Sequence, residues 1–389
     1  MSGIQAIVSA RGAKRWTEGH PWIFRSDVVQ SPAAPAGLAE VRDTRGRPLG
    51  WGLWSPGSEI AFRQLDADPA AKINTAWWRE RIGRAIARRS GLEQIASAFR
   101  LVHGEGDGLP SLIVDRYDRW LVVQLLSAGL ETFRAQIVDA LADLTGCAGI
   151  LARNDATVRT REGLSRDVEV LRGEVPDEVL VAEHGVKYIA ALRTGQKTGA
   201  FLDQRENRAL VASIARGRGL DLFSYHGSFA LHLARGATEV TSVDSSGPAL
   251  ERGRQNASLN DATNIRFVEA DAFEFLRAED QAGRRYETIV VDPPAFAKNR
   301  ASLVAATRGY RDLNLHAMRL LAPGGLLFTA SCSYHLTKSL FLDMLRDAGA
   351  ASGRRLILRG LTVQPSDHPE LVTVPETGYL KGALLEALD

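Results

Sequence analysis

Two short motifs in the last third of the chain carry a carboxylic acid and a thiol. In the first, an apolar run over residues 286–291 ends in Asp292 and two prolines; in the second, an apolar run over residues 326–330 leads to Ser331 and Cys332. Such runs are typical of buried strands in a parallel sheet, whose carboxyl ends meet at one ligand-binding edge. The pair therefore predicts chemistry that uses a nucleophile and a proton partner on one flat substrate.

A turn over residues 221–229 follows another apolar run and precedes a predicted helix. A turn of this kind directs backbone N–H groups at a ligand, as in dinucleotide-binding folds. Gly227 is its only glycine, and Tyr225 stands where the first glycine of a dinucleotide-binding motif would be. A bulky residue impedes the close backbone approach that a pyrophosphate needs, which disfavours a nicotinamide oxidoreductase. We expect Phe223, Tyr225 and Gly227 to contact a ligand that has no phosphate.

Three acids, Asp221, Asp244 and Asp271, lie at the ends of three successive predicted strands. Asp244 is placed to accept hydrogen bonds from ribose hydroxyls, and Asp271 to meet an adenine amino group. Each acid taken alone could instead cap the helix that follows it. The ordered series favours a nucleoside site that includes the adjacent Ser245 and Ala272. S-adenosyl-L-methionine, which has a ribose and an adenine but no phosphate, is the predicted cofactor.

Length and composition set broader limits. The chain has 389 residues, of which 45% are hydrophobic and 24% charged, so we expect a globular protein of two or three domains. No apolar stretch reaches the ~18 residues of a transmembrane span, and the N-terminus does not resemble a signal peptide, so a cytoplasmic location and no membrane partner are expected. The spacing of Cys147 and Cys332 fits neither a disulfide framework nor a metal site, and no bound metal is expected.

Charge is unevenly distributed along the chain. Residues 1–100 contain 15 Lys and Arg against 9 Asp and Glu, a net charge of +6, although the whole chain carries only +2. A basic N-terminal part is typical of a module that binds a polyanion. A solvated helix face, rich in arginine over residues 79–89, explains the same excess equally well.

The order of predicted elements divides the chain into three domains. Short strands at residues 4–8, 38–42, 49–53 and 60–64 predict a small barrel within residues 1–72. Residues 73–177 combine helices at 75–89 and 132–144 with strands at 112–114, 120–125 and 149–153, which predicts a central α+β domain. Within 178–389, strands at 219–223, 239–243 and 265–269 alternate with helices at 228–235 and 247–260. This alternation predicts a parallel sheet with helices on both faces.

The chain resembles the ribosomal RNA large-subunit methyltransferase I family over nearly its whole length. The resemblance is carried by an ordered series of motifs: Gly19-His20-Pro21-Trp22-Ile23-Phe24, Glu105-Gly106-Asp107-Gly108-Leu109-Pro110, Val114-Asp115-Arg116-Tyr117, Gln196-Lys197-Thr198-Gly199, Phe201-Leu202-Asp203-Gln204-Arg205, Phe223-Ser224-Tyr225, Asp292-Pro293-Pro294-Ala295-Phe296, Ser331-Cys332-Ser333, Asp367-His368-Pro369 and Tyr379-Leu380-Lys381-Gly382. Ser228 departs from the family pattern, because relatives commonly have a second glycine there.

The resemblance implies an α/β protein with a C-terminal Rossmann-like class I methyltransferase domain, an N-terminal PUA-like β-barrel that binds RNA, and a small central α/β domain. It implies methylation of C5 of a cytosine in large-subunit ribosomal RNA, either naked or in an assembly intermediate, with a homodimer as one option for the oligomeric state. It places Gln204 and Arg205 near the methionine carboxylate of the cofactor. For Arg205 the alternative is an ion pair with Glu206 or Asp203.

The residues also suggest how such a reaction would proceed. C5 of cytosine is a poor nucleophile, and addition of a thiolate to C6 makes it one, which gives Cys332 the role of nucleophile. Asp292, also counted among the cofactor-binding residues, is the candidate partner at N3 and the exocyclic amine. Related two-cysteine enzymes have a second thiol where this chain has Ala295, so a single-cysteine mechanism is implied. The base that removes the C5 proton is not identified, and Cys147 is interpreted as a small core residue.

Two other functions stay open at this point. The same scaffold could methylate a nitrogen of an RNA base without a covalent adduct, and Cys332 is the feature that argues against this. The chain could also be a non-catalytic RNA-binding or ribosome-assembly protein, but it contains both candidate catalytic groups, Asp292 and Cys332.

Overall fold

The computed structural model describes residues 4–297 and 299–388, which form two compact units. The first unit contains the residues up to 181 together with 190–202 and 366–377. The second contains residues 182–189, 203–365 and those from 378 onward. The chain thus passes from one unit to the other several times. The division into domains at 1–72, 73–177 and 178–389 stays a prediction.

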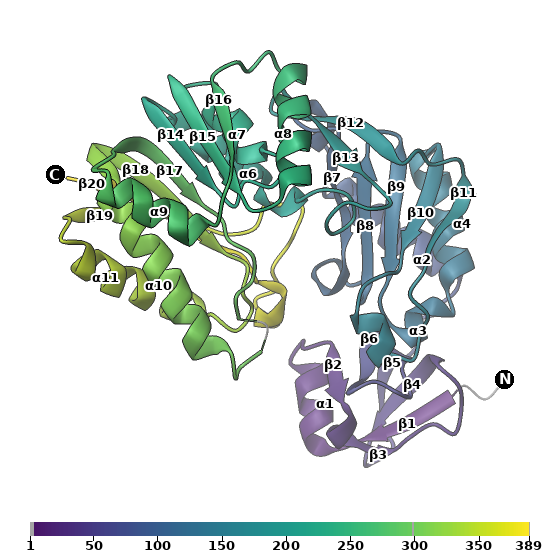
Figure 1. Cartoon of the computed structure of the whole chain (residues 1–389). Coiled ribbons are helices and arrows are strands. Elements are labelled where there is room, and N and C mark those ends of the chain that lie inside the picture. Colours follow the sequence, from purple (N-terminus) through teal and green to yellow (C-terminus); the bar gives the residue numbers. More distant parts are fainter. Residues whose placement is uncertain (1–3, 298, 389) are drawn as a thin grey trace. The chain divides into compact units, whose positions relative to one another are not determined.

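The first unit begins with a six-stranded sheet in the order β2-β6-β5-β4-β1-β3 (Figure 1). Its strands are β1 (Ile4–Val8), β2 (Trp22–Phe24), β3 (Val28–Gln30), β4 (Gly37–Asp43), β5 (Pro48–Trp54) and β6 (Ile60–Asp66). The four strands that the sequence predicts here are confirmed. A helix that it did not predict, α1 (Ala10–Thr17), follows β1 and is anchored by Trp16, whose Nε1 donates to the Leu49 carbonyl at 2.9 Å.

A five-stranded sheet in the order β11-β10-β9-β8-β7 completes the first unit. Its strands are β7 (Ala98–His103), β8 (Leu112–Tyr117), β9 (Trp120–Leu125), β10 (Gly149–Arg153) and β11 (Val168–Gly173), and its helices are α2 (Thr75–Ala87), α3 (Ala128–Glu131), α4 (Arg134–Thr145) and α5 (Val158–Arg161).

The two sheets of the first unit are joined by a shared core and by a buried ion pair. Leu53 and Leu65 from the N-terminal sheet pack in the same apolar cluster as Trp78 of α2, and Cys147 packs against its edge. Arg63 of β6 is 2.8 Å from Glu162, and both side chains are almost fully buried. Separating a buried pair leaves an uncompensated charge, so the N-terminal sheet depends on the central one for its stability.

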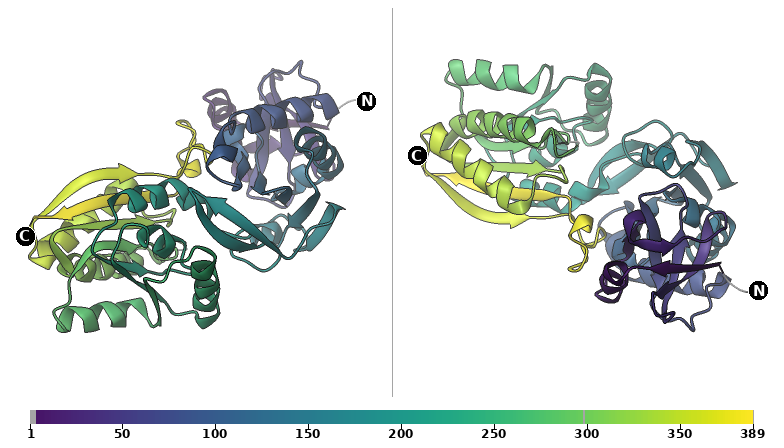
Figure 2. Two further views of the ribbon diagram at one scale, coloured as in Figure 1. Left: turned by 90° about the horizontal axis from the view of Figure 1, so that it is seen from above. Right: turned by 90° about the horizontal axis from the view of Figure 1, so that it is seen from below.

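The second unit contains a seven-stranded sheet in the order β16-β15-β14-β17-β18-β20-β19. Its strands are β14 (Arg218–Leu222), β15 (Glu239–Asp244), β16 (Ile265–Glu269), β17 (Tyr286–Val291), β18 (Leu321–Ser331), β19 (Leu356–Thr362) and β20 (Lys381–Ala387). The expected parallel sheet is correct only in part, because β20 runs antiparallel to both β18 and β19. Figure 2 shows the C-terminus at the end of β20. A hairpin, β12 (Glu178–Glu183) and β13 (Val186–Ala191), precedes this sheet in the chain.

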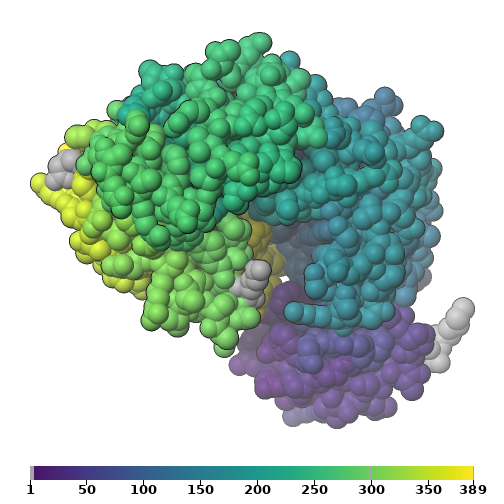
Figure 3. Space-filling model, in the orientation of Figure 1, coloured from purple at the N-terminus to yellow at the C-terminus, as the bar shows by residue number. Residues whose placement is uncertain are grey.

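Helices cover both faces of this sheet, as predicted. One core cluster joins β14, β17 and β18 to α9 (Ala272–Gln281), α10 (Leu303–Arg319) and α11 (Lys338–Ser352). A second cluster joins the other face to α6 (Arg205–Ile214) and α7 (Ser228–Leu233), and α8 (Gly247–Leu259) packs on β15 and β16. Figure 3 shows atoms of the second unit, coloured green, on the surface that faces the viewer. Helices on both faces leave only the ends of the strands accessible to a ligand.

Within residues 4–297 and 299–388, none of the helices has the length and apolar character needed to cross a membrane.

Candidate cofactor and catalytic site

The carboxyl ends of four neighbouring strands place several of the predicted site residues in one row. Leu222 of β14 pairs with Val291 of β17 and with Val243 of β15, and Val291 also pairs with Thr329 of β18. The next residue along each strand is therefore Phe223, Asp292, Asp244 or Ala330. Paired strands lie ~4.8 Å apart. One edge of the sheet therefore holds the predicted ligand turn, Asp244, Asp292 and the end of β18, which leads to Cys332.

The turn after β14 has a conformation that favours glycine, although it contains only one. Phe223 has a φ of 62°, Tyr225 of 48° and Gly227 of 80°. A side chain on Gly227 would come within 3.3 Å of the Phe267 ring, so this position has little room for a larger residue. Non-glycine residues with positive φ cost free energy and are concentrated at ligand sites. Tyr225 thus has the positive φ that is usual for glycine, the residue that a dinucleotide-binding motif would have at this position, although it carries a large side chain.

Asp221 is fully buried in β14 beneath this turn. Burial raises the pKa of its carboxyl well above its usual range, and the nearby carboxylates of Asp292 and Asp244 raise it further. The backbone amide of Ala230 faces the group and acts in the opposite direction. Among the residues that the structure describes, however, neither carboxylate oxygen has a partner in hydrogen-bond geometry. A buried acid without a donor is costly unless a ligand supplies one, which makes Asp221 a candidate for contact with a cationic group.

Asp244 and Asp271 differ in what their carboxylates already bind. Asp244 accepts hydrogen bonds from the backbone amides of Tyr225, at 2.8 Å, and Ser246, at 2.9 Å, so it holds the ligand turn in place. Asp271 is exposed and caps α9 through the amides of Phe273 and Glu274. The cap that the sequence allowed as an alternative is therefore present at Asp271. Its contact with adenine, and the inclusion of Ser245 and Ala272 in the site, stay predictions.

Gln204 and Arg205 lie at the start of α6, but their side chains have different surroundings. The side-chain amide of Gln204 donates to Oδ1 of Asp292 at 2.8 Å. Arg205 is fully buried, and its guanidinium is 3.7 Å from Glu206. The ion pair with Glu206 that the sequence offered as an alternative is thus present. A cofactor contact at Arg205 stays a prediction.

Cys332 follows the last residue of β18 and is half-buried. Two residues to which the sequence assigned no role surround its loop. Tyr310 of α10 places its hydroxyl 2.9 Å from Ser333 Oγ and 3.3 Å from the Pro294 carbonyl. Lys381 of β20 donates from Nζ to the Ser333 carbonyl at 2.7 Å. Tyr310 therefore ties the loop after Asp292 to the loop of Cys332. In the sequence, Tyr310 is one of several residues on the apolar face of α10, so no local pattern marks it as part of the site.

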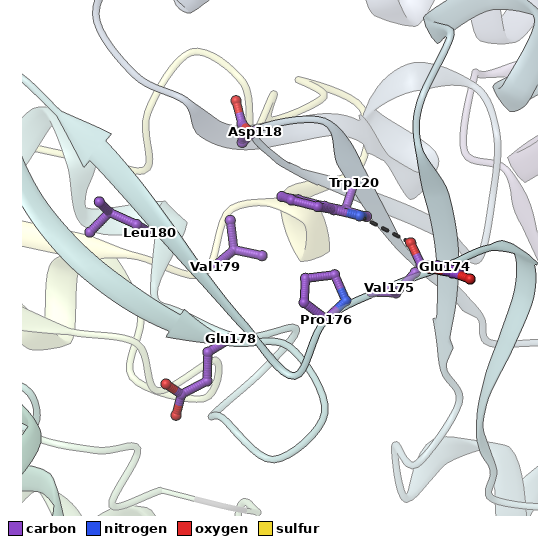
Figure 4. Close-up of a pocket in the computed structure, with 8 residues that line it drawn as sticks. All are labelled: Asp118, Trp120, Glu174, Val175, Pro176, Glu178, Val179 and Leu180. Carbon is purple, nitrogen blue, oxygen red and sulfur yellow. Dashed lines mark hydrogen bonds between the residues drawn. The ribbon is translucent and has the colours of Figure 1, made fainter.

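Two further features involve residues to which the sequence assigned no part in the site. His226 and His232 are buried, and burial lowers the pKa of each to about 4, which is typical of neutral core histidines. Figure 4 shows an open groove of the first unit, in which the Trp120 indole donates to the Glu174 carbonyl at 3.1 Å. The groove is lined by Asp118, Trp120, Glu174, Val175, Pro176, Glu178, Val179 and Leu180. None of the predicted site residues contributes to this lining.

Comparisons with solved structures support the fold. A SAM-dependent methyltransferase from Streptococcus mutans is 21% identical and superposes with a TM-score of 0.84 over 98% of this chain and 100% of its own. A methyltransferase solved in complex with SAH is 22% identical and superposes with a TM-score of 0.85 over the same shares of the two chains. At these identities the likeness establishes the shared fold.

Sequence comparisons establish the family. The S-adenosylmethionine-dependent methyltransferase family matches residues 99–371, and the PUA-like domain family matches residues 6–66. The ribosomal RNA large subunit methyltransferase I of Tolumonas auensis is 41% identical over 95% of this chain and 96% of its own length. The protein of the same name from Aeromonas hydrophila is 41% identical over 100% of both chains. With S-adenosylmethionine as its cofactor and a PUA-like domain at its N-terminus, this chain belongs to the ribosomal RNA large subunit methyltransferase I family.

Proposed function

We propose that this protein methylates C5 of a cytosine in large-subunit ribosomal RNA through a covalent adduct at Cys332. The RNA substrate is taken from the name of the relatives. The observation that supports the choice of atom is that Asp292 and Cys332 follow the ends of β17 and β18, which pair directly through Val291 and Thr329. An acid and a thiol that follow the ends of neighbouring strands can both act on one pyrimidine ring.

The residues around the strand ends fit S-adenosylmethionine in charge. The cofactor carries a sulfonium and an ammonium cation, and Asp221, Asp244 and Asp292 lie near enough to one another for their charges to interact. Buried Asp221 lacks a hydrogen-bond donor among the described residues, and an ammonium group would supply one. The proposed cofactor site consists of Gln204, Arg205, Asp221, Phe223, Tyr225, Gly227, Asp244, Ser245, Asp271, Ala272 and Asp292.

Cys332 begins the proposed reaction as a thiolate. Its sulfur forms a bond to C6 while the electrons of the C5–C6 double bond move into the ring, and Asp292 provides the proton or hydrogen bond that stabilises the negative charge at N3. The bound cofactor supplies an electrophilic methyl group to C5. Loss of the C5 proton to a base then allows the C6–sulfur bond to break, which restores the aromatic ring and the thiolate.

The PUA-like and central domains are proposed to bind the RNA around the target. A base stacked inside a helix cannot reach a thiol, so the target must be flipped out, at a cost of a few kcal/mol that contacts in the site offset. The partner is large-subunit ribosomal RNA, either naked or in an assembly intermediate, and a homodimer is one option for the active form.

Trapping of the covalent adduct tests this proposal. The target is first mapped by mass spectrometry of ribosomal RNA from a strain that lacks the enzyme. RNA with 5-fluorocytosine at that position has no C5 proton to lose, so methyl transfer should leave a denaturation-resistant adduct with the wild-type protein and with Cys147→Ala, but not with Cys332→Ala. If Cys332→Ala still methylates normal RNA, the covalent mechanism fails and N-methylation on the same scaffold replaces it. If the wild-type protein methylates no RNA, a non-catalytic role in ribosome assembly replaces both.

A further inference from the structure

Lys381 is a buried lysine next to the loop of the proposed nucleophile. It is the first residue of β20, and its backbone pairs with Ser331, the last residue of β18. Only 5% of its surface is exposed. Lysine is seldom buried to this extent unless its ammonium group has an anionic partner, because removing the charge from water is costly.

The contacts of Lys381 converge on the residues that flank Cys332. Its Nζ donates to the Ser333 carbonyl at 2.7 Å, and Ser331 lies opposite it in the sheet. Lys381 thus contacts the residue before Cys332 through its backbone and the residue after Cys332 through its side chain. A carbonyl oxygen satisfies one of the three ammonium donors but supplies no charge.

The ionisable side chains around Lys381 are a thiol, a phenol and a second lysine. Among the described residues, no carboxylate lies within ion-pair distance of its Nζ. Burial lowers the pKa of Lys381 to about 8, the Cys332 thiolate acts to raise it, and exposed Lys338 at the start of α11 lowers it further. Tyr310 of α10, whose hydroxyl lies 2.9 Å from Ser333 Oγ, supplies no negative charge, because burial raises the pKa of its phenol. Cys332, which lies between the two residues that Lys381 contacts, is therefore the group here whose ionised form would carry the balancing negative charge.

We propose that Lys381 is a positioning residue that holds Cys332 as a thiolate by placing an ammonium group beside its loop. The proton of the thiol moves to the neutral amine of Lys381, which gives a thiolate and an ammonium ion with no change in total charge. An ordinary thiol has a pKa of roughly 8.5, so a neighbouring cation increases the fraction of reactive thiolate at neutral pH. The role of Lys381 and Cys332 in catalysis rests on the proposed function, whereas the effect of Lys381 on the ionisation of Cys332 does not.

Alkylation of Cys332 as a function of pH tests the proposal without RNA. In a Cys147→Ala background, Cys332 is the only thiol, and its rate of reaction with iodoacetamide reports its thiolate fraction. Lys381→Gln keeps a donor for the Ser333 carbonyl but removes the charge, whereas Lys381→Arg keeps both. We expect the glutamine variant to react about tenfold more slowly near neutral pH and its profile to move to higher pH. The arginine variant and the matched control Lys338→Met should stay close to the parent.

Other outcomes overturn the proposal. An unchanged profile in folded Lys381→Gln would show that the charge does not act on Cys332, and equal shifts in the glutamine and arginine variants would show that only packing matters. Where Lys381→Gln does not fold, the thiolate absorbance of the folded parent during a pH titration decides the same question. A cation beside Cys332 predicts a midpoint below the roughly 8.5 of an ordinary thiol, and a midpoint at or above that value overturns the proposal. The 5-fluorocytosine experiment fails or succeeds independently of these measurements.

Discussion

The side-chain amide of Gln204 donates a hydrogen bond of 2.8 Å to Oδ1 of Asp292, 88 positions further along the chain. Gln204 is itself oriented by Asn207, whose Nδ2 donates to its side-chain oxygen. The NH₂ group of Gln204 must therefore face the acid. This bond joins a residue predicted to bind the cofactor to the residue predicted to assist the chemistry, so changes at either one should affect both steps.

Loss of the Asp244 carboxylate should weaken cofactor binding. If this group accepts hydrogen bonds from the ribose hydroxyls, Asp244→Ala should reduce the affinity for S-adenosylmethionine by about 1.5–3 kcal/mol, the usual value for a hydrogen bond to a charged group. Isothermal titration calorimetry measures the change, and Glu251→Ala, an exposed acid on α8, serves as the control. Wild-type affinity in a folded Asp244→Ala protein would remove Asp244 from the cofactor site.

The buried acid Asp221 should make stability depend on pH. Its folded-state pKa lies well above its usual value, so above about pH 4 the folded protein retains a proton that the unfolded chain has lost. The contribution of this group to the free energy of unfolding therefore falls as pH rises from about 4 through the folded-state pKa. Asp221→Asn should remove this component. Urea denaturation of cofactor-free wild type and variant at several pH values measures it, and identical pH dependence in the two proteins would contradict the assignment.

Removal of the Tyr310 hydroxyl should slow turnover without weakening cofactor binding. Tyr310→Phe keeps the ring but loses the contacts to Ser333 and Pro294 that join the two catalytic loops. Neutral hydrogen bonds contribute about 0.5–1.5 kcal/mol each, so kcat should fall about tenfold. Tyr286→Phe is a matched control, because that hydroxyl bonds Glu279 at the opposite end of β17. Equal kcat values for the two variants would show that the loops do not depend on Tyr310.

Exposed basic residues of the N-terminal sheet should contribute to RNA binding. Deletion of this sheet would be a poor test, because its side chains share the core of the central sheet. Lys14→Gln and Arg45→Gln, both at exposed positions, should instead reduce the slope of log affinity against log salt by about 0.7 per lost contact on single strands. Arg254→Gln and Arg346→Gln, exposed on the second unit, are the controls. Equal slopes for both pairs would identify the basic excess as a solvated surface.

Local sequence patterns predicted the helices and strands in which apolar residues recur in a run or at a regular spacing. The predicted strand at residues 265–269 has the same limits as β16, whose alternate residues Ile265 and Phe267 pack against a neighbouring apolar cluster. The helix predicted at 247–260 corresponds to α8, which buries one face. Helix α1 was missed because only Gly12 and Trp16 are buried among its eight residues, which leaves no repeat to detect. The direction of β20 was missed for another reason: an apolar run has the same composition in a parallel and in an antiparallel strand.

The sequence by itself determined the candidate chemistry, because Asp292, Cys332 and the turn near Tyr225 are recognisable from residue type and local order. It could not determine which distant side chains surround them. Lys381 reaches the loop of Cys332 only because β20 pairs antiparallel to β18, and Tyr310 reaches the same loop only because α10 packs over that face of the sheet. Such contacts depend on strand order and helix packing. Both are determined by the burial of the whole apolar surface of the sheet, so a local run of residues does not reveal them.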